Sequence, residues 1–176
     1  MSYVYQCEDS LEGIFTAIYN IYRDKRNLPD TRIAVQEECV LFAEYIPVET
    51  NPESAGKVMN TCRDLFGEKD FYGLCMALNS YDAEKAQAVY KTIAYGLKAK
   101  PAKGHLFDHL SDEHVLKAFK LSNTVCRENH HLMGFTRFRE LENGILYADI
   151  SPKNNVLVPL MEHFSDRMPS ENFAVF

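Results

Sequence analysis

The stretch His130–Pro152 reads HHLMGFTRFRELENGILYADISP, and it decides the fold of the C-terminal part of the chain. Apolar and polar residues alternate along it with the period of two that is typical of a β-strand. In its middle, Asn143-Gly144 favours a type I′ turn, because both central residues of that turn need a positive φ. The stretch therefore predicts a β-hairpin, with the change from helix to sheet placed at His130.

This hairpin places two arginines on its apolar face. With Asn143-Gly144 as a two-residue loop, Arg139 lies opposite Ala148 and Arg137 lies opposite Ile150. The same face, the natural core side, carries Met133, Phe135, Leu141 and Leu146. An unpaired buried charge costs several kcal/mol. Each arginine therefore needs an acidic partner, or the face is open to a ligand, or a β-bulge shifts the register.

Two interpretations of Arg137 and Arg139 follow. In the structural one, the aliphatic stems pack at the rim of the sheet while the guanidiniums reach water or a carboxylate. In the functional one, the pair forms an anion or phosphate site, for which arginine is the better donor because its guanidinium is forked. Arg137 is expected to lie deeper in the strand than Arg139 and is the stronger candidate.

Before the hairpin, helical periodicity dominates. Ser10 can cap a helix over residues 10–23, and Asn51, Pro52 and Gly67 mark the start and end of the clearest helix in the chain. Other helices are predicted through Phe71–Leu78, from Asp82 to Leu97, from Ser111 through Val125, and after Asn154-Asn155. Short extended segments are predicted at Tyr3–Cys7, 32–36, 44–50 and 172–176, with Pro47 excluding a central strand at 44–50.

Together these segments predict an α+β fold in one domain, residues 1–176. The helical part covers about residues 10–129, and a small antiparallel sheet with one packed helix covers 130–176. The chain has neither a leader-like N-terminus nor an apolar run long enough for a membrane span. We therefore expect a soluble, cytoplasmic protein without membrane contact.

Charge is unevenly distributed along the chain. The net charge is -6, which argues against a protein that binds nucleic-acid phosphates over its whole surface. Residues 91–139, however, carry 9 Lys and Arg against 4 Asp and Glu. This basic island, which includes Lys117 and Lys120, is either a solvated helix face or a phosphate-facing patch.

Two groups of residues could carry chemistry. His105 and His109 are spaced so that they could share a metal ion on a helix, with Asp108 or His114 as a further ligand, but the segment reads more simply as a loop before a helix. His130 lies near Cys126 and Glu128, which could indicate a nucleophile pair, although a histidine between helix and sheet is more often a hydrogen-bonding residue.

Several nucleotide and cofactor motifs are absent from the sequence. There is no GxxxxGK[ST], no GxGxxG and no CxxxCxxC, which excludes a P-loop and an iron-sulfur cluster of the radical-SAM kind. The five cysteines are widely spaced without a CxxC pair. We therefore expect no cofactor.

Several short motifs occur together in the C-terminal half: Glu128-x-His130, Gly134-Phe135-x-Arg137-Phe138-x-Glu140, Pro152 with Asn155, His163-Phe164 and Arg167. With these motifs and the N-terminal YVYQCEDSLEGIFTAIYNIY, the chain resembles a family of uncharacterised proteins connected with DNA metabolism. Members of that family are encoded beside a radical-SAM protein of DNA repair or modification, and the domain is also found fused to uracil-DNA-glycosylase-like domains. Relatives often have a basic residue where this chain has His131, which weakens phosphate binding at that position.

The resemblance implies a process and no catalytic mechanism. The leading hypothesis is a DNA-repair accessory module that binds DNA or docks a radical-SAM or uracil-DNA-glycosylase-like enzyme. Its candidate anion-binding residues are Arg137, Arg139, Lys117, Lys120, His130 and Asn155. One alternative is an enzyme on DNA or a modified base that uses His130 as acid or base and Arg137 to steady an anion. Another is a protein-docking module whose acidic residues 1–90 meet a basic partner.

Overall fold

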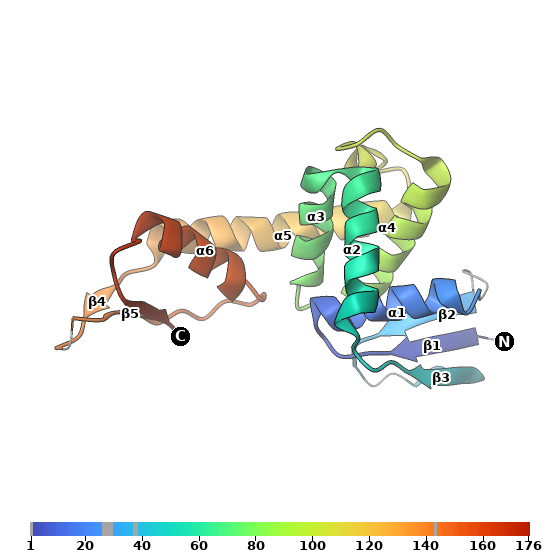
Figure 1. The fold of residues 1–176 in the computed structure, drawn as a ribbon, viewed down its shortest axis with the longest axis horizontal. Coiled ribbons are helices and arrows are strands. Elements are labelled where there is room, and N and C mark those ends of the chain that lie inside the picture. The colour runs from blue at the N-terminus through green and yellow to red at the C-terminus, as the bar shows by residue number, and fades with distance from the viewer. Residues whose placement is uncertain (1, 26–29, 37–38, 143) are drawn as a thin grey trace.

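The computed structural model describes residues 2–25, 30–36, 39–142 and 144–176. It confirms the α+β class, with a helical body and a smaller C-terminal lobe joined by one long helix, α5 (Figure 1). The body contains β1 (Ser2–Gln6), α1 (Leu11–Arg23), β2 (Thr31–Ala34), β3 (Ala43–Pro47), α2 (Pro52–Phe66), α3 (Glu68–Leu78), α4 (Lys85–Ala99) and a short 3-10 turn at Leu106–Asp108. Then follow α5 (Glu113–Phe135), β4 (Arg139–Glu140), β5 (Leu146–Ala148), α6 (Leu157–Arg167) and β6 (Phe173–Val175).

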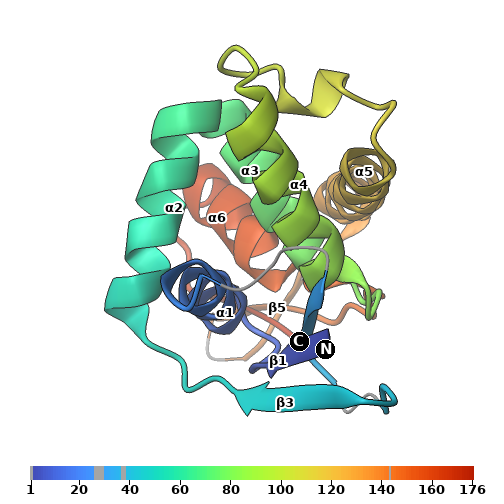
Figure 2. The same ribbon diagram turned by 90° about the vertical axis from the view of Figure 1, so that its right-hand side faces the viewer.

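The predicted extended segments of the N-terminal half form a small parallel sheet. Its order is β2-β1-β3, and α1 lies against it (Figure 2). Val4 and Tyr5 of the central strand are fully buried. Pro47 ends the edge strand β3, in agreement with the expectation that this proline excludes a central strand.

Local capping signals predicted most helix starts within a few residues. Asn51 caps α2 by accepting from the Ser54 amide at 2.9 Å, and Gly67 ends that helix with a φ of 85°. Asp82 does not cap α4 directly. Its side chain bonds the Glu84 amide and its carbonyl accepts from Lys85, so the helix begins three residues later. Likewise, Asp112 rather than Ser111 caps α5.

The boundary predicted at His130 is wrong. α5 includes His130 and the five residues after it, and it ends at Phe135. The Thr136 amide and hydroxyl both donate hydrogen bonds to the Leu132 carbonyl. The segment 130–135 is too short for its apolar residues to distinguish a period of two from the periodicity of a helix. Arg137 consequently lies in the connection after α5, and only Arg139 is in a strand.

The hairpin register also differs from the prediction by one residue. Arg139 pairs with Tyr147 instead of Ala148, and the Leu141 amide bonds the Ile145 carbonyl at 2.9 Å. The loop is therefore Glu142–Gly144, in which Gly144 has a φ of 78° and Asn143 lies outside the described residues. A three-residue loop with glycine in the left-handed region is the next most common hairpin connection. Because side chains alternate, this slip moves the side chains of one strand to the opposite face relative to those of the other strand.

Aromatic residues hold the C-terminal lobe together. Phe138 meets Phe164 of α6 edge to face at 4.9 Å and Phe173 of β6 at 5.9 Å between ring centroids. β6 lies parallel to β5, so the sheet is mixed, and only the β4–β5 pair has the expected antiparallel direction. Ala148 of β5 and Leu160 of α6 are buried as well. Phe138 and Ala148 therefore face inward, which turns Arg139 and Tyr147 outward.

In the part of the chain that the structure describes, no helix combines the length and the apolar character needed to cross a bilayer.

Candidate functional site

A polar cleft of about 590 Å³ lies where the end of α5 meets the hairpin. The α5 side and the connection after it supply one part of its lining, and β4, β5 and the residues after β5 supply the other. The lining residues are His131, Leu132, Phe135, Thr136, Arg137, Arg139, Tyr147, Asp149, Ile150 and Ser151. Both arginines of the opening stretch are among them.

Arg137 and Arg139 are exposed, so the expectation that they lie on a core face is wrong. The physical reason is the register, which places Arg139 beside Tyr147 on the outward face. Among the described residues, neither guanidinium forms an ion pair within 4.0 Å or a side-chain hydrogen bond. Asp149 also lines the cleft without pairing to either arginine. The cleft thus holds two guanidiniums whose donors no described residue accepts from.

Aromatic side chains accompany the arginines. Phe135 is 64% exposed, and its ring stacks on His131, one helical turn earlier, with centroids 4.4 Å apart and an angle of 23° between the ring planes. From the strand side, Tyr147 lines the cleft and packs against Phe176 at 5.5 Å. His131 lines the cleft although the sequence offers no basic residue at this position. The four-residue spacing of His131 and Phe135 is the sequence signal that pairs them, because both lie on α5.

One exposed face of α5 leads into the cleft. We call this face the α5 stripe and define it as Lys120, Thr124, Arg127, His131 and Phe135, all of which are exposed. Their three- and four-residue spacing keeps them within about 80° of one another around the helix axis, over a length of about 22 Å. Part of the basic island is therefore aligned with the cleft.

Lys117 and Asn155 are not brought to the cleft. The Lys117 ammonium contacts a carboxylate oxygen of Asp82 at 2.5 Å, about 27 Å along α5 from Phe135. Burial raises the pKa of Asp82, but hydrogen bonds from Lys117 and Glu84 bring it below its ordinary value. Asn155 lies near the start of α6, where its amide bonds the Asn79 carbonyl at 2.8 Å.

His130 also stays outside the cleft. It is exposed on α5, about 100° around the helix from His131, and is not among the lining residues. One turn earlier, Cys126 packs against the small apolar cluster of Met76, Val125 and Val156. Burial raises the pKa of the Cys126 thiol above its ordinary value, which keeps it protonated at neutral pH. The position of His130 outside the cleft therefore does not favour catalysis with Arg137, and the raised pKa of Cys126 does not favour this thiol as a nucleophile.

Glu128, from the Glu128-x-His130 motif, stabilises the loop before α6. Its carboxylate accepts from the Lys153 amide at 2.7 Å, from the Asn154 amide at 3.0 Å and from the Asn154 side-chain amide at 2.5 Å. Asn154 in turn accepts from the Tyr81 amide at 3.1 Å. Burial raises the pKa of Glu128, but these hydrogen bonds outweigh it and hold the pKa below its ordinary value. This network ties α5 to the loop before α6 and explains why Asn154 does not cap α6.

The histidines near residue 110 do not share a metal-binding geometry. His105 bonds Asp108 at 2.6 Å, whereas His109 bonds the hydroxyl of Tyr95 at 3.0 Å. His114 lies within 3.6 Å of Glu113 in the first turn of α5. Across the described ranges, no group of three or more His, Cys, Asp or Glu side chains is placed to hold a metal ion.

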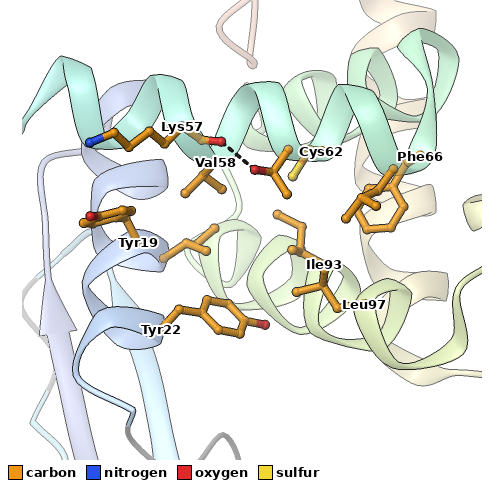
Figure 3. Close-up of a pocket in the computed structure, with 11 residues that line it drawn as sticks. Tyr19, Tyr22, Lys57, Val58, Cys62, Phe66, Ile93 and Leu97 are labelled. Atoms are coloured by element: carbon orange, nitrogen blue, oxygen red, sulfur yellow. Dashed lines mark hydrogen bonds between the residues drawn. The ribbon is translucent and has the colours of Figure 1, made fainter.

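A second hollow, of about 220 Å³, lies between α1, α2 and α4, and it is almost entirely apolar. Figure 3 shows the side chains that point into it, among them Tyr19, Tyr22, Val58, Cys62, Phe66, Ile93 and Leu97. Burial raises the pKa of the Cys62 thiol to about 12, so this cysteine is no nucleophile at neutral pH. Lys57 at its edge is paired with Glu53 at 2.7 Å. The hollow therefore lacks the free charged groups of the polar cleft.

Comparison with known proteins agrees with the expected likeness to an uncharacterised family. A family model described as a domain of unknown function, DUF4130, matches residues 83–176. The matched region covers α4, α5 and the whole C-terminal lobe, and hence the cleft and the α5 stripe. No curated protein and no solved structure matches the chain.

Proposed function

The chain belongs to the DUF4130 family, and on that premise we propose that it is a DNA-binding accessory module of DNA metabolism that uses the polar cleft and the α5 stripe. The observation that carries the proposal is the exposure of Arg137 and Arg139, without acidic partners among the described residues, in one cleft of a chain with a net charge of -6. Fork-shaped guanidinium donors suit phosphate oxygens.

The α5 stripe extends this charge beyond the cleft. Lys120 and Arg127 are the two cations of the α5 stripe, and its other members, Thr124, His131 and Phe135, carry no negative charge. Glu128, the nearest carboxylate on the helix, is held by the loop before α6. Together with the two arginines of the cleft, the stripe offers four full cations along one side of the molecule, which is the arrangement that phosphate contacts require.

The family resemblance supports DNA as the anion. The resemblance implies relatives encoded beside a radical-SAM protein or fused to uracil-DNA-glycosylase-like domains, and such a context would bring the module near enzymes that act on DNA. We propose that such an enzyme docks away from the cleft, on the outward side of α6. There Leu157 is 44% exposed and Val158 is 64% exposed, and both line a shallow apolar surface with Met161.

Salt dependence of binding tests the proposal. Four phosphate contacts predict a slope of log K against log salt of about -3.6 for duplex DNA and about -2.8 for single strands. The double variant Arg137→Ala/Arg139→Ala removes two contacts and should halve the slope. Labelled oligonucleotides titrated from 50 to 200 mM salt by fluorescence anisotropy measure both.

A matched control removes the same charge elsewhere. Lys98 and Lys103 are exposed at and after the end of α4, and the variant Lys98→Ala/Lys103→Ala should leave the slope near that of the parent protein. Lys117→Ala should also have little effect, because its ammonium already contacts Asp82. If the parent protein binds neither form of DNA at 50 mM salt, the proposal fails. If both double variants lower the slope equally, the binding is not in the cleft.

A further inference from the structure

The polar cleft contains aromatic surface that the fold does not use. Phe135 ends a long helix with 64% of its surface exposed, and it forms a two-ring platform with His131 at a centroid distance of 4.4 Å. A phosphate-binding site alone needs no such platform, since phosphate recognition depends on charge and hydrogen-bond donors.

A third ring lines the same space from the strand side. Tyr147 is paired across the hairpin with Arg139, so a ring and a guanidinium lie side by side on the outward face. The cleft is therefore lined by aromatic rings on both sides, with Arg137 in the connection after α5 and Arg139 in β4. Its volume of about 590 Å³ lies within the range of sites that hold a small molecule or a nucleoside-sized group.

The charges divide the cleft into two parts. Asp149 is the only carboxylate among the described lining residues, and it lies directly after β5, two residues beyond Tyr147. A carboxylate repels a phosphate but accepts hydrogen bonds from the amino groups of bases. Phosphates are thus favoured beside Arg137 and Arg139, and the space near Tyr147 and Asp149 suits the uncharged part of a nucleotide.

We propose that the cleft takes an unpaired base, so that the protein binds single-stranded in preference to duplex nucleic acid; this rests on the proposed function of the same site. Base faces are buried in a duplex, and only an unpaired base can stack on Phe135 or Tyr147. The arginines hold the flanking phosphates, and the α5 stripe carries the strand onward past Arg127 to Lys120.

The test compares single-stranded and duplex oligonucleotides of one sequence by fluorescence anisotropy at 50 and 150 mM salt. The parent protein should bind the single strand about tenfold more tightly. Phe135→Ala should weaken single-strand binding about tenfold and change duplex binding less than twofold. Phe135→Tyr, which keeps a ring, should retain the affinity. Tyr81→Ala, which removes an aromatic side chain of similar exposure, 70%, in the α3–α4 connection, is the control and should change neither.

A second readout reports stacking directly. An oligonucleotide that carries 2-aminopurine should show quenched fluorescence when the parent protein binds, and Phe135→Ala should lose this quenching at saturating protein. Equal affinity for single strands and duplexes overturns the inference but leaves the proposed function standing. So does a Phe135→Ala variant that loses both affinities equally, which would indicate a disturbed cleft. Absence of binding to either form at 50 mM salt overturns both proposals.

Discussion

Removal of the Glu128 carboxylate should loosen the loop that joins the C-terminal lobe to α5. In Glu128→Ala, the backbone and side-chain amide donors of Asn154 lose their acceptor. Asn154 is buried, with only 5% of its surface exposed. Each buried donor left without a partner costs about 1–3 kcal/mol. The Lys153 amide is at an exposed residue and can bond water instead. We therefore expect the free energy of unfolding to fall by about 3 kcal/mol.

Two further variants are compared with the stability loss of Glu128→Ala. Glu128→Gln keeps one acceptor oxygen but turns a donor toward the other amide, so it should lose about half as much, about 1.5 kcal/mol. Glu162→Ala, on the exposed side of α6, is the control and should change stability by less than about 0.5 kcal/mol. Urea unfolding followed by circular dichroism ranks the three variants, and hydrogen exchange locates the loss at residues 151–156.

The pH dependence has a defined sign. The pKa of Glu128 in the folded protein lies below its ordinary value of 4.5, so the unfolded chain binds the proton more tightly. The stabilisation is fully present at neutral pH and is lost as the pH falls below 4.5 through the folded-state pKa. The difference between the parent protein and Glu128→Ala should therefore shrink in that range. Equal stability of Glu128→Ala and Glu162→Ala at pH 7, or unchanged exchange at residues 151–156, would refute the reasoning.

Two glycines and one aromatic residue give the remaining predictions. In Gly96→Ala, the new Cβ would lie 2.6 Å from the buried ring of Phe66, so unfolding should become easier by about 1–3 kcal/mol. Gly134→Ala has open space around the new Cβ within a helix and should stabilise by about 0.5–1 kcal/mol; urea titrations of the two variants should shift in opposite directions. Phe164→Ala removes a ring that is 4% exposed and should cost about 3 kcal/mol, with faster hydrogen exchange confined to the C-terminal lobe. Exchange that rises equally in the helical body would contradict this.

Helix starts and ends were predictable where the sequence carries its own cap. Ser10 accepts from the Gly13 amide at 3.0 Å, as the capping signal predicted, and Asn51 with Gly67 delimits α2. These signals act over three or four residues and need no distant contact. Asp82 and Asn154 also look like caps, but other parts of the molecule use their side chains, through Lys117 in one case and Glu128 in the other.

The candidate site was predictable in part. Arg137 and Arg139 were singled out from the sequence, and the structure brings them to one cleft. The reason given for them was wrong, because the arginines do not lie on a core face. His131 joins them only because α5 reaches Phe135, whereas the sequence motif favours its neighbour His130. One residue along a helix turns a side chain by about 100°, so a small error in a boundary changes which side chains meet.

The sequence by itself determined the α+β class, the order of most helices and the presence of a hairpin around Gly144, because periodicity and turn residues act locally. Only the tertiary structure decided the hairpin register and the length of α5. The register goes with the packing of Phe138 against Phe164 and Phe173, residues up to 35 positions apart. That packing turns the two arginines toward solvent, and no local pattern near Arg137 could have shown it.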